Sequence, residues 1–399
     1  MMAIAVVSRF IVGALLSLIL FSPPGYGRSW RVEKDGSGDF AVIQNAVDAA
    51  APGDTVVVGP GRYEDKSVLS CISSPEFAYI NVQCEDLTLI GSGASQTIVG
   101  PEDGVGQVPG YPVGVFASSS CGFHVLEIMN IRIENIWTSV YIGLGSKVTI
   151  SECEFGGGEA GTNSSCDSML VRNCEFGQTV GTRDQVISYY QTFLKLDNCR
   201  FALSGRQVHV QVQGTPRAEI LNCEFVGGFG GGNIVQGGRA AIHNNQFSDQ
   251  DGFGIAVGST GGCVASVRDC EFSGQYVAFR QDGGNSVWEV ESTTVTDVQV
   301  GTLAFGSLNG GYIRDSILAK GERYVVLDYL GLKSSATEPI HFDMTDNWWG
   351  TTDPDSIQAL IFDYNDDPAS GYIIDWQPFK SEPVPTEKKS LGSVKSMFR

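Results

Sequence analysis

Basic residues are scarce in this sequence. The 45 acidic side chains outnumber the 26 basic ones, which gives a formal net charge of −19. Residues 1–27 carry a net charge of +1 and residues 380–399 carry +3, so the body between them carries −23. A body this acidic repels nucleic acid and anionic lipid, but it leaves neutral glycans and divalent cations as partners. Solubility alone would also account for such a charge.

Histidine is scarce as well. The chain has four histidines, which lie far apart in the sequence at His124, His209, His243 and His341. None has the spacing of a zinc site or of a nucleophile–histidine–acid triad. The glycines of "DGSGDF" (residues 35–40) precede an expected helix, but P-loop and dinucleotide spacings are absent, and Asp39 sits where a phosphate would lie.

Long apolar runs are also rare, and the only one that could enter a bilayer is N-terminal. Arg9 precedes the apolar stretch Phe10–Phe21, and small residues follow a Pro-Pro pair at 23–24. This pattern predicts a cleaved signal peptide over residues 1–27. We therefore expect a secreted, periplasmic or cell-surface protein with no membrane span in the mature chain. A retained anchor is the alternative, because there is no clean Ala-x-Ala cleavage site.

Charged residues make up only 18% of the chain, whereas glycine is abundant at 50 residues. This composition is unlike that of a helical protein and favours an all-β chain with many turns. The feature that stands out is a recurring motif, seen as "VRNCEF" (171–176), "KLDNCRF" (195–201) and "EILNCEFV" (219–226).

We number the motif from its cysteine, position 0. Apolar or small residues lie at −5 and −3, mostly Asn or Asp at −1, and mostly Phe at +2. Position 0 is occupied by Cys153, Cys174, Cys199, Cys223, Asn245, Cys270, Thr293, Ser316 and Asn347. Successive copies are 21 to 31 residues apart. Upstream, Ile136 with Asn135 before it fits the same frame. A unit of this length, repeated in series, predicts a solenoid.

The internal spacing predicts the shape of each unit. Positions −5 and −3 share one face of a strand, and positions 0 and +2 share one face of another. The offset of three between −3 and 0 requires a bend at −1, where Asn and Asp tolerate the left-handed conformation. The sequence therefore predicts an all-β, right-handed parallel β-helix of roughly ten coils. We expect the Phe side chains to stack inside it and the Asn side chains to bond between coils. A β-propeller is disfavoured because its blades need about 40–50 residues.

Both ends of the solenoid predict caps. In the N-terminal cap (residues 30–63), Asp39 is expected to N-cap a short helix that ends at Gly53. In the C-terminal cap (residues 347–379), Asp353 and Pro354 are expected to start a second short helix. Residues 372–376 would form a closing strand. Residues 380–399 are expected to form a flexible tail.

At these residues the chain resembles secreted right-handed parallel β-helix proteins of the pectin-lyase-like superfamily. "DGSGDFAVIQNAVDAAAPGDTVVVGPGRY" (35–63) resembles the opening of that superfamily, and "NWWGTTDPDSIQALIFDYNDDP" (347–368) resembles the last coil of bacterial members without an assigned function. The resemblance covers residues 30–379 and implies one domain over residues 28–379. It specifies a fold more than an activity, because this fold carries many functions.

The superfamily's pectin methylesterases, lyases and polygalacturonases make an enzyme the alternative. "FRQDGG" places Arg280, Gln281 and Asp282 together and resembles part of the methylesterase motif. The aromatic-rich stretch around a second aspartate has no counterpart, and the polygalacturonase strings are missing. The same residues also suit a turn after a strand.

"DYNDDP" places Asp363, Asn365 and Asp367 at alternate positions, as at the start of a calcium loop. The glycine at the sixth position and the glutamate at the twelfth are absent, so this is not an EF-hand. Calcium is a candidate ion here, and a hydrogen-bonded turn is the alternative. No cofactor is required by any motif.

The chain has 10 cysteines. Those at position 0 alternate with Asn, Thr and Ser, which predicts a small inward slot filled by free thiols. A linear stack lacks the geometry of a tetrahedral metal site. Off the ladder lie Cys71, Cys84, Cys121, Cys166 and Cys263. Proximity in sequence makes Cys71–Cys84 the expected disulfide.

The sequence thus favours a non-catalytic β-helix protein that is structural or binds glycans or another surface polymer. The alternative is a polysaccharide-active enzyme of the pectinesterase or pectate-lyase kind.

Overall fold

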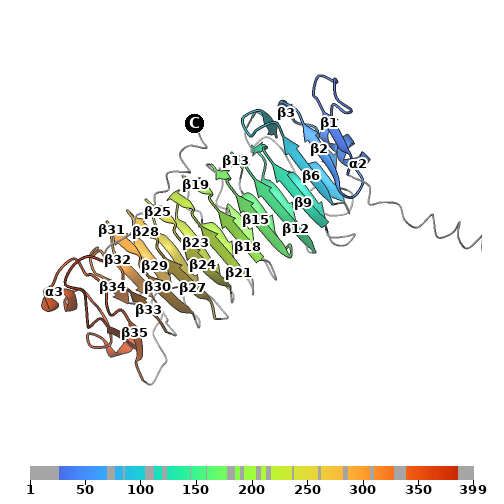
Figure 1. Ribbon diagram of the computed structural model, residues 1–399. Coiled ribbons are helices and arrows are strands. Elements are labelled where there is room, and N and C mark those ends of the chain that lie inside the picture. The colour runs from blue at the N-terminus through green and yellow to red at the C-terminus, as the bar shows by residue number, and fades with distance from the viewer. Residues whose placement is uncertain are drawn as a thin grey trace, which may run out of the picture.

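The computed structural model is a long parallel β-helix whose coils stack along one axis (Figure 1). The N-terminal helix α2 (Ile43–Ala49) lies at one end and α3 (Pro354–Gln358) at the other. The structure describes residues 27–69, 77–83, 86–103, 112–118, 124–143, 145–158, 160–177, 185–188, 193–203, 208–212, 217–235, 238–258, 262–281, 286–305, 310–327 and 338–384. Residues 1–26 of the predicted signal peptide and residues 385–399 of the predicted tail lie outside these ranges. No helix in the described ranges is long and apolar enough to cross a membrane.

Three sheets run along the rod. Sheet A is 14-stranded: β1 (Ser29–Val32), β2 (Asp54–Val58), β6 (Leu87–Gly91), β9 (His124–Met129), β12 (Ser146–Ser151), β15 (Ser168–Arg172), β18 (Phe193–Asp197), β21 (Arg217–Leu221), β24 (Arg239–His243), β27 (Val264–Arg268), β30 (Val287–Glu291), β33 (Gly311–Arg314), β35 (Ile340–Asp343) and β36 (Tyr372–Asp375). Sheet B is 10-stranded: β3 (Gly61–Tyr63), β7 (Thr97–Val99), β10 (Arg132–Glu134), β13 (Glu154–Gly156), β16 (Glu175–Phe176), β19 (Arg200–Leu203), β22 (Glu224–Gly227), β25 (Gln246–Ser248), β28 (Glu271–Ser273) and β31 (Thr294–Thr296).

Sheet C is 12-stranded: β4 (Ser67–Val68), β5 (Phe77–Gln83), β8 (Val113–Ser118), β11 (Thr138–Ile142), β14 (Ala160–Ser164), β17 (Val186–Ser188), β20 (Val208–Val212), β23 (Gly230–Val235), β26 (Phe253–Gly258), β29 (Val277–Gln281), β32 (Gly301–Phe305) and β34 (Val325–Leu327). Neighbouring strands pair in parallel, apart from β4 with β5. The predicted parallel β-helix of roughly ten coils is confirmed.

The corner at position −1 has the predicted left-handed backbone. Positive φ angles between 50° and 58° occur at Glu152, Asn173, Asn198, Asn222, Asn244, Asp269, Ser292, Asp315 and Asp346. Consecutive asparagines also bond to each other: Nδ2 of Asn198 donates to Oδ1 of Asn173 at 2.7 Å, and Nδ2 of Asn244 donates to Oδ1 of Asn222 at 2.7 Å. An amide carries both a donor and an acceptor, so one residue type can propagate such a ladder.

The phenylalanines at +2 stack inside the rod. The rings of Phe176, Phe201 and Phe225 lie 4.6 and 4.7 Å apart and are nearly parallel. Sheet C makes room for the stack with glycine, because a Cβ at Gly231 would lie 2.4 Å from the Phe247 ring. The stack therefore depends on both sheets.

The register corrects the upstream repeat. Ile128 lies opposite Ile150, and Ile133 lies opposite Phe155. Position 0 of that coil is therefore Ile131, with Asn130 at the corner, instead of Ile136. Asn135 misled the prediction because it also has a positive φ, at a second corner of the same coil.

The N-terminal helix begins later than predicted. The residue before α2 is Val42, which makes no side-chain cap, so Asp39 is not the N-cap. Asp39 instead accepts a hydrogen bond from the backbone N–H of Arg31, beside the bridge between Val32 and Phe40. The helix ends at Ala49, before Gly53. Local turn bonding to β1 thus outweighs the capping preference of Asp39.

The C-terminal elements follow the prediction. The Asp353 side chain caps α3, and Pro354 occupies its first turn. Ile357 is buried, and β36 closes sheet A beside β35.

The cysteines at position 0 are buried free thiols, as predicted. Burial raises the pKa of Cys270 to about 12. Cys166 and Cys263 are also free and buried. The expected Cys71–Cys84 disulfide lies outside the described residues.

Candidate functional site

A continuous row of long polar side chains runs along the outside of sheet B. These residues follow position 0, so they point away from the interior that their neighbours at 0 and +2 fill. We call them the sheet-B row: Arg132, Glu154, Glu175, Arg200, Glu224, Gln246, Glu271 and Thr294. Each lies directly opposite the next on consecutive coils, about 4.8 Å apart. The register gives the surface a polar group at every coil.

Ion pairs order this row. The Arg200 guanidinium contacts Glu175 at 3.0 Å and Glu224 at 3.2 Å. Further along, Nε2 of Gln246 donates to Glu271 at 3.3 Å. The side chains of the Arg200 cluster are about one-third exposed, so the groups are fixed by their partners and still reach solvent.

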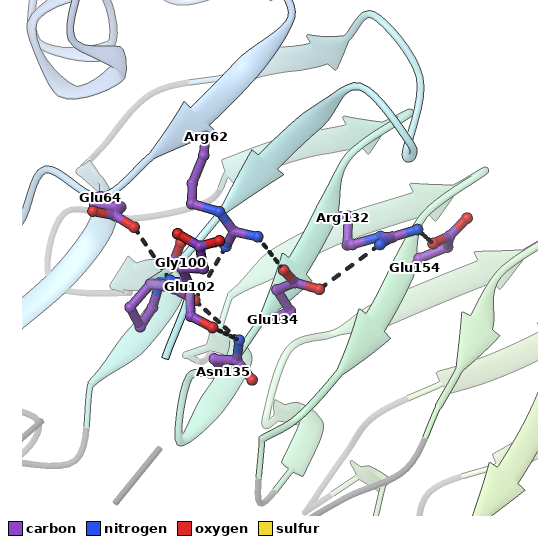
Figure 2. Close-up of polar contacts among 9 residues, drawn as sticks. Arg62, Glu64, Gly100, Glu102, Arg132, Glu134, Asn135 and Glu154 are labelled. Atoms are coloured by element: carbon purple, nitrogen blue, oxygen red, sulfur yellow. Dashed lines mark hydrogen bonds and ion pairs between the residues drawn. The ribbon is translucent and has the colours of Figure 1, made fainter. Parts of the chain in front are cut away.

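Figure 2 shows the N-terminal end of the row, where it becomes a network. Arg132 contacts Glu154 at 2.5 Å and Glu134 at 3.9 Å. Glu134 in turn accepts from Arg62 of β3 at 2.6 Å. The guanidinium of Arg62 also donates to the backbone oxygen of Gly100 at 2.9 Å.

The network also fixes the chain that follows β7. Nδ2 of Asn135 donates to the oxygens of Pro101 and Glu102, and the N–H of Glu102 donates to Glu64. Asn135, which the sequence suggested as part of the motif corner, therefore anchors this segment beside the row.

The chemistry of the row is that of hydrogen bonding. Its carboxylates outnumber its guanidinium groups, and each guanidinium already contacts carboxylates. An anionic polymer would have to break these pairs, whereas hydroxyl groups can donate to carboxylates and accept from guanidinium groups. In the described part of the chain, no group of three His, Cys, Asp or Glu side chains could hold a metal.

Of the three predicted esterase-like residues, the structure describes Arg280 and Gln281, and these two do not share a surface. Arg280 and Gln281 are neighbours on β29, so their side chains point to opposite faces. The Arg280 guanidinium lies 5.0 Å from the Phe253 ring centre. Gln281 is buried and accepts a hydrogen bond from Nε1 of Trp288 at 2.9 Å. Asp282 lies outside the described residues.

The residues proposed for calcium form a turn. Asp363 is 1% exposed, and its carboxylate accepts hydrogen bonds from the N–H groups of Asn365 and Ile374. Its backbone oxygen accepts from the N–H of Asp367. The side chains of Asn365 and Asp367 are exposed. These hydrogen bonds are those expected for a local turn, the alternative to a calcium loop.

A second polar cluster, which sequence reasoning missed, lies outside sheet A. Glu291 accepts from the Tyr312 hydroxyl at 2.9 Å and contacts Arg268 at 3.4 Å. Burial and the bond to Glu291 raise the pKa of Tyr312. Burial and the charge of Arg268 lower the pKa of His243 on the adjoining strand. The signal was available at positions −4 and −2 of the repeat, which point outward.

Of the other histidines, His341 contacts Asp375 at 3.0 Å. The side chains of His124 and His209 lie outside the described part of the chain.

The fold defines the class: the chain forms a right-handed parallel β-helix. The family model "Right handed beta helix region" matches residues 113–300. No curated protein matches the chain.

Among solved structures, the catalytic unit of a thermostable GH87 alpha-1,3-glucanase from Streptomyces thermodiastaticus strain HF3-3 has a TM-score of 0.55 at 12% identity, covering 92% of this chain and 70% of that one. The PL6 family alginate lyase AlyGC has a TM-score of 0.46 at 12% identity, covering 90% and 52%. Carrot pectin methylesterase has a TM-score of 0.31 at 13% identity, covering 90% and 90%. At these identities the likeness concerns the fold alone.

Proposed function

We propose that the protein is a secreted, non-catalytic β-helix that binds a neutral polysaccharide or similar surface polymer along the sheet-B row. The observation that carries this proposal is the register of the row, which sets ordered polar groups on consecutive coils. A linear polymer lying along the rod would meet an equivalent contact at each coil, so weak contacts would add along the chain. The excess of carboxylates in the row favours a neutral polymer over a polyuronate.

Catalysis has less support. Gln281 is buried, and its Oε1 accepts from Trp288, so it does not share the outer surface with Arg280. The glucanase, lyase and methylesterase named above act on polysaccharides, which keeps the enzyme alternative in view, although fold alone does not carry an activity.

The test is binding of the full chain to immobilised neutral glucans, compared with alginate and pectate. Arg200→Ala should weaken binding to the neutral polymer about ten-fold or more, because it removes charged hydrogen bonds worth about 1.5–3 kcal/mol. The matched control is Arg217→Ala, since Arg217 also contacts a glutamate, Glu219 at 3.4 Å, but lies on sheet A.

Equal losses in the two variants, or binding to none of the polymers, would reject the site. Incubation with the same polymers tests the enzyme alternative. New reducing ends, unsaturated uronides or released methanol would show turnover and would overturn the non-catalytic assignment.

A further inference from the structure

The corner row changes its chemistry toward the C-terminal end of the rod. Where earlier coils have asparagine, later ones have Asp269, Asp315 and Asp346, with Ser292 between the first two. All four side chains are exposed. We call the three aspartates the acidic corner row. Because the backbone keeps its left-handed corner at each of them, their carboxylates lie along one line parallel to the rod axis.

This acidic corner row lacks the bonding that stabilises the asparagine ladder. An ionised aspartate only accepts hydrogen bonds, so aspartates on successive coils cannot bond to one another. The arginines that precede two of them face sheet A, where Arg268 contacts Glu291 and Arg314 contacts Asp343. Among the described residues, the side chains of Asp269 and Asp346 have no hydrogen-bond or ion-pair partner.

One basic side chain, that of Lys380 in the C-terminal segment, already contacts this row. The Lys380 ammonium donates to Oδ1 of Asp315 at 2.7 Å, which raises the pKa of Lys380. The backbone reaches the row as well, because the N–H of Lys380 donates to the oxygen of Asn347 at 2.9 Å and the N–H of Asp346 donates to that of Pro378 at 2.7 Å. The chain therefore leaves the folded body on the acidic corner row.

The residues that follow are basic. Beyond the described residues the tail carries Glu387 against Lys388, Lys389, Lys395 and Arg399, in a protein of net charge −19. The eight residues from Lys380 to Lys388 can span up to about 26 Å. Asp269 is two coils from Asp315, or about 10 Å away. The lysines can therefore reach the remaining carboxylates of the row, and Glu271 beside it.

We propose that the basic tail, residues 385–399, docks along the acidic corner row and extends the contact that Lys380 begins. The tail neutralises Asp269 and Asp346, whose carboxylates receive no hydrogen bond from an asparagine at a neighbouring corner. Because the tail is tethered at Lys380, its local concentration is high, so even weak exposed ion pairs keep it near the row. Added salt should release it, since the Debye length falls to about 3 Å at 1 M. This inference does not require that the protein bind a polymer, although Glu271 belongs to the sheet-B row as well.

The test is zero-length carbodiimide cross-linking of the full chain at low protein concentration, with the linked peptides identified by mass spectrometry. We expect Lys388 and Lys389 to link to Asp269, Asp346 or Glu271 within one chain. The links should disappear in 1 M salt. The double substitution Lys388→Glu and Lys389→Glu should remove them, and Asp269→Asn should reduce them while the far-UV spectrum stays unchanged.

Asp48, an exposed carboxylate on α2 at the opposite end of the rod, serves as the control acceptor. The proposal is overturned if the tail links to Asp48 as often as to the acidic corner row, or if it does not link at all. Links found only between chains, rising with protein concentration, would also overturn it by showing that a second copy binds the tail.

Discussion

The middle coils and the C-terminal coils have the same backbone conformation but differ in the side chains at the corner, at position 0 and at +2. In the middle coils, asparagines bond from corner to corner, thiols occupy position 0 in every coil but that of Asn245, and phenylalanine rings stack at +2. In the last coils the corners are Ser292, Asp315 and Asp346, and +2 holds Val295, Leu318 and Trp349. The corner geometry is the same in both regions, so it depends on the tolerance of Asn, Asp and Ser for positive φ and does not require the amide ladder.

Position 0 shows where the lost contacts are replaced. In the C-terminal coils the N–H of Thr293 donates to the Ser316 hydroxyl at 3.1 Å, and the N–H of Ser316 donates to Oδ1 of Asn347 at 2.9 Å. The thiols of the middle coils instead donate to carbonyl oxygens, such as 3.2 Å from Cys223 to Leu221. Asn245 is the exception among the middle coils, because its Oδ1 accepts from the N–H of Cys223 at 2.7 Å. The thiol-bearing coils thus rely more on packing, whereas coils with Asn, Ser or Thr at position 0 add buried hydrogen bonds to the backbone of a neighbouring coil or of their own.

The largest difference should appear when the packing is removed. Phe201→Ala should lower the free energy of unfolding by about 3–5 kcal/mol, because it leaves a cavity between two stacked rings. Val295→Ala at the same repeat position should cost about 1.6 kcal/mol for two lost methyl-sized groups. Urea unfolding of both variants checks this, and equal losses would contradict the comparison.

The asparagine ladder can be tested by a substitution that replaces a single amide nitrogen with oxygen. Nδ2 of Asn222 donates to Asp197 at 2.8 Å, so Asn222→Asp replaces that donor with a carboxylate facing another. We expect a loss of about 1–3 kcal/mol near neutral pH. The loss should shrink at acidic pH, where the new carboxyl regains a proton to donate. Thermal unfolding at pH 7 and pH 4 measures it, and a loss that does not depend on pH would point to strain instead.

The repeat made the fold predictable because it encodes the inward faces twice per coil. Cys223 and Phe225 could be placed inside, and Asn222 at a corner, from spacing alone. Asn135 could not be placed, since two corners in one coil favour the same residue types and only strand pairing tells them apart.

The candidate site was less predictable than the fold. The sheet-B row occupies the one outward position between two inward ones, where sequence reasoning saw only the inward residues. Its ion pairs join residues 22 to 25 positions apart, such as Arg132 with Glu154 and Arg200 with Glu175. Such pairs emerge only once the register is known. For Gln281, the match to the methylesterase motif suggested a catalytic role, but the alternation of side chains along β29 points this one toward the interior.

Alkali should affect the thiol-filled coils through their buried sulfurs. Folding raises the pKa of Cys270 from 9.0 to about 12. The contribution of this thiol to the free energy of unfolding is therefore fully present below pH 9. It is lost as the pH rises from 9 toward 12, because the thiol of the unfolded chain ionises first. Each pH unit costs up to about 1.4 kcal/mol for this group. Cys270→Ser should flatten the decline in urea unfolding between pH 8 and pH 10 under reducing conditions, and an unchanged slope would assign the decline to other groups.

The smallest expected effect is also the most direct test of why the corners differ. Asn244 ends the amide ladder, and its Oδ1 faces the coil that carries Asp269. Asp269→Asn should extend the ladder by one bond, in which the new amide donates to Asn244, and so raise stability by up to about 1 kcal/mol. The measurement is thermal unfolding in 1 M salt, where contacts with the basic tail are screened. A gain would mean that the acidic corners sacrifice stability for charge, which fits a docking role. A loss would mean that Asp269 has a bonding role in the folded body itself.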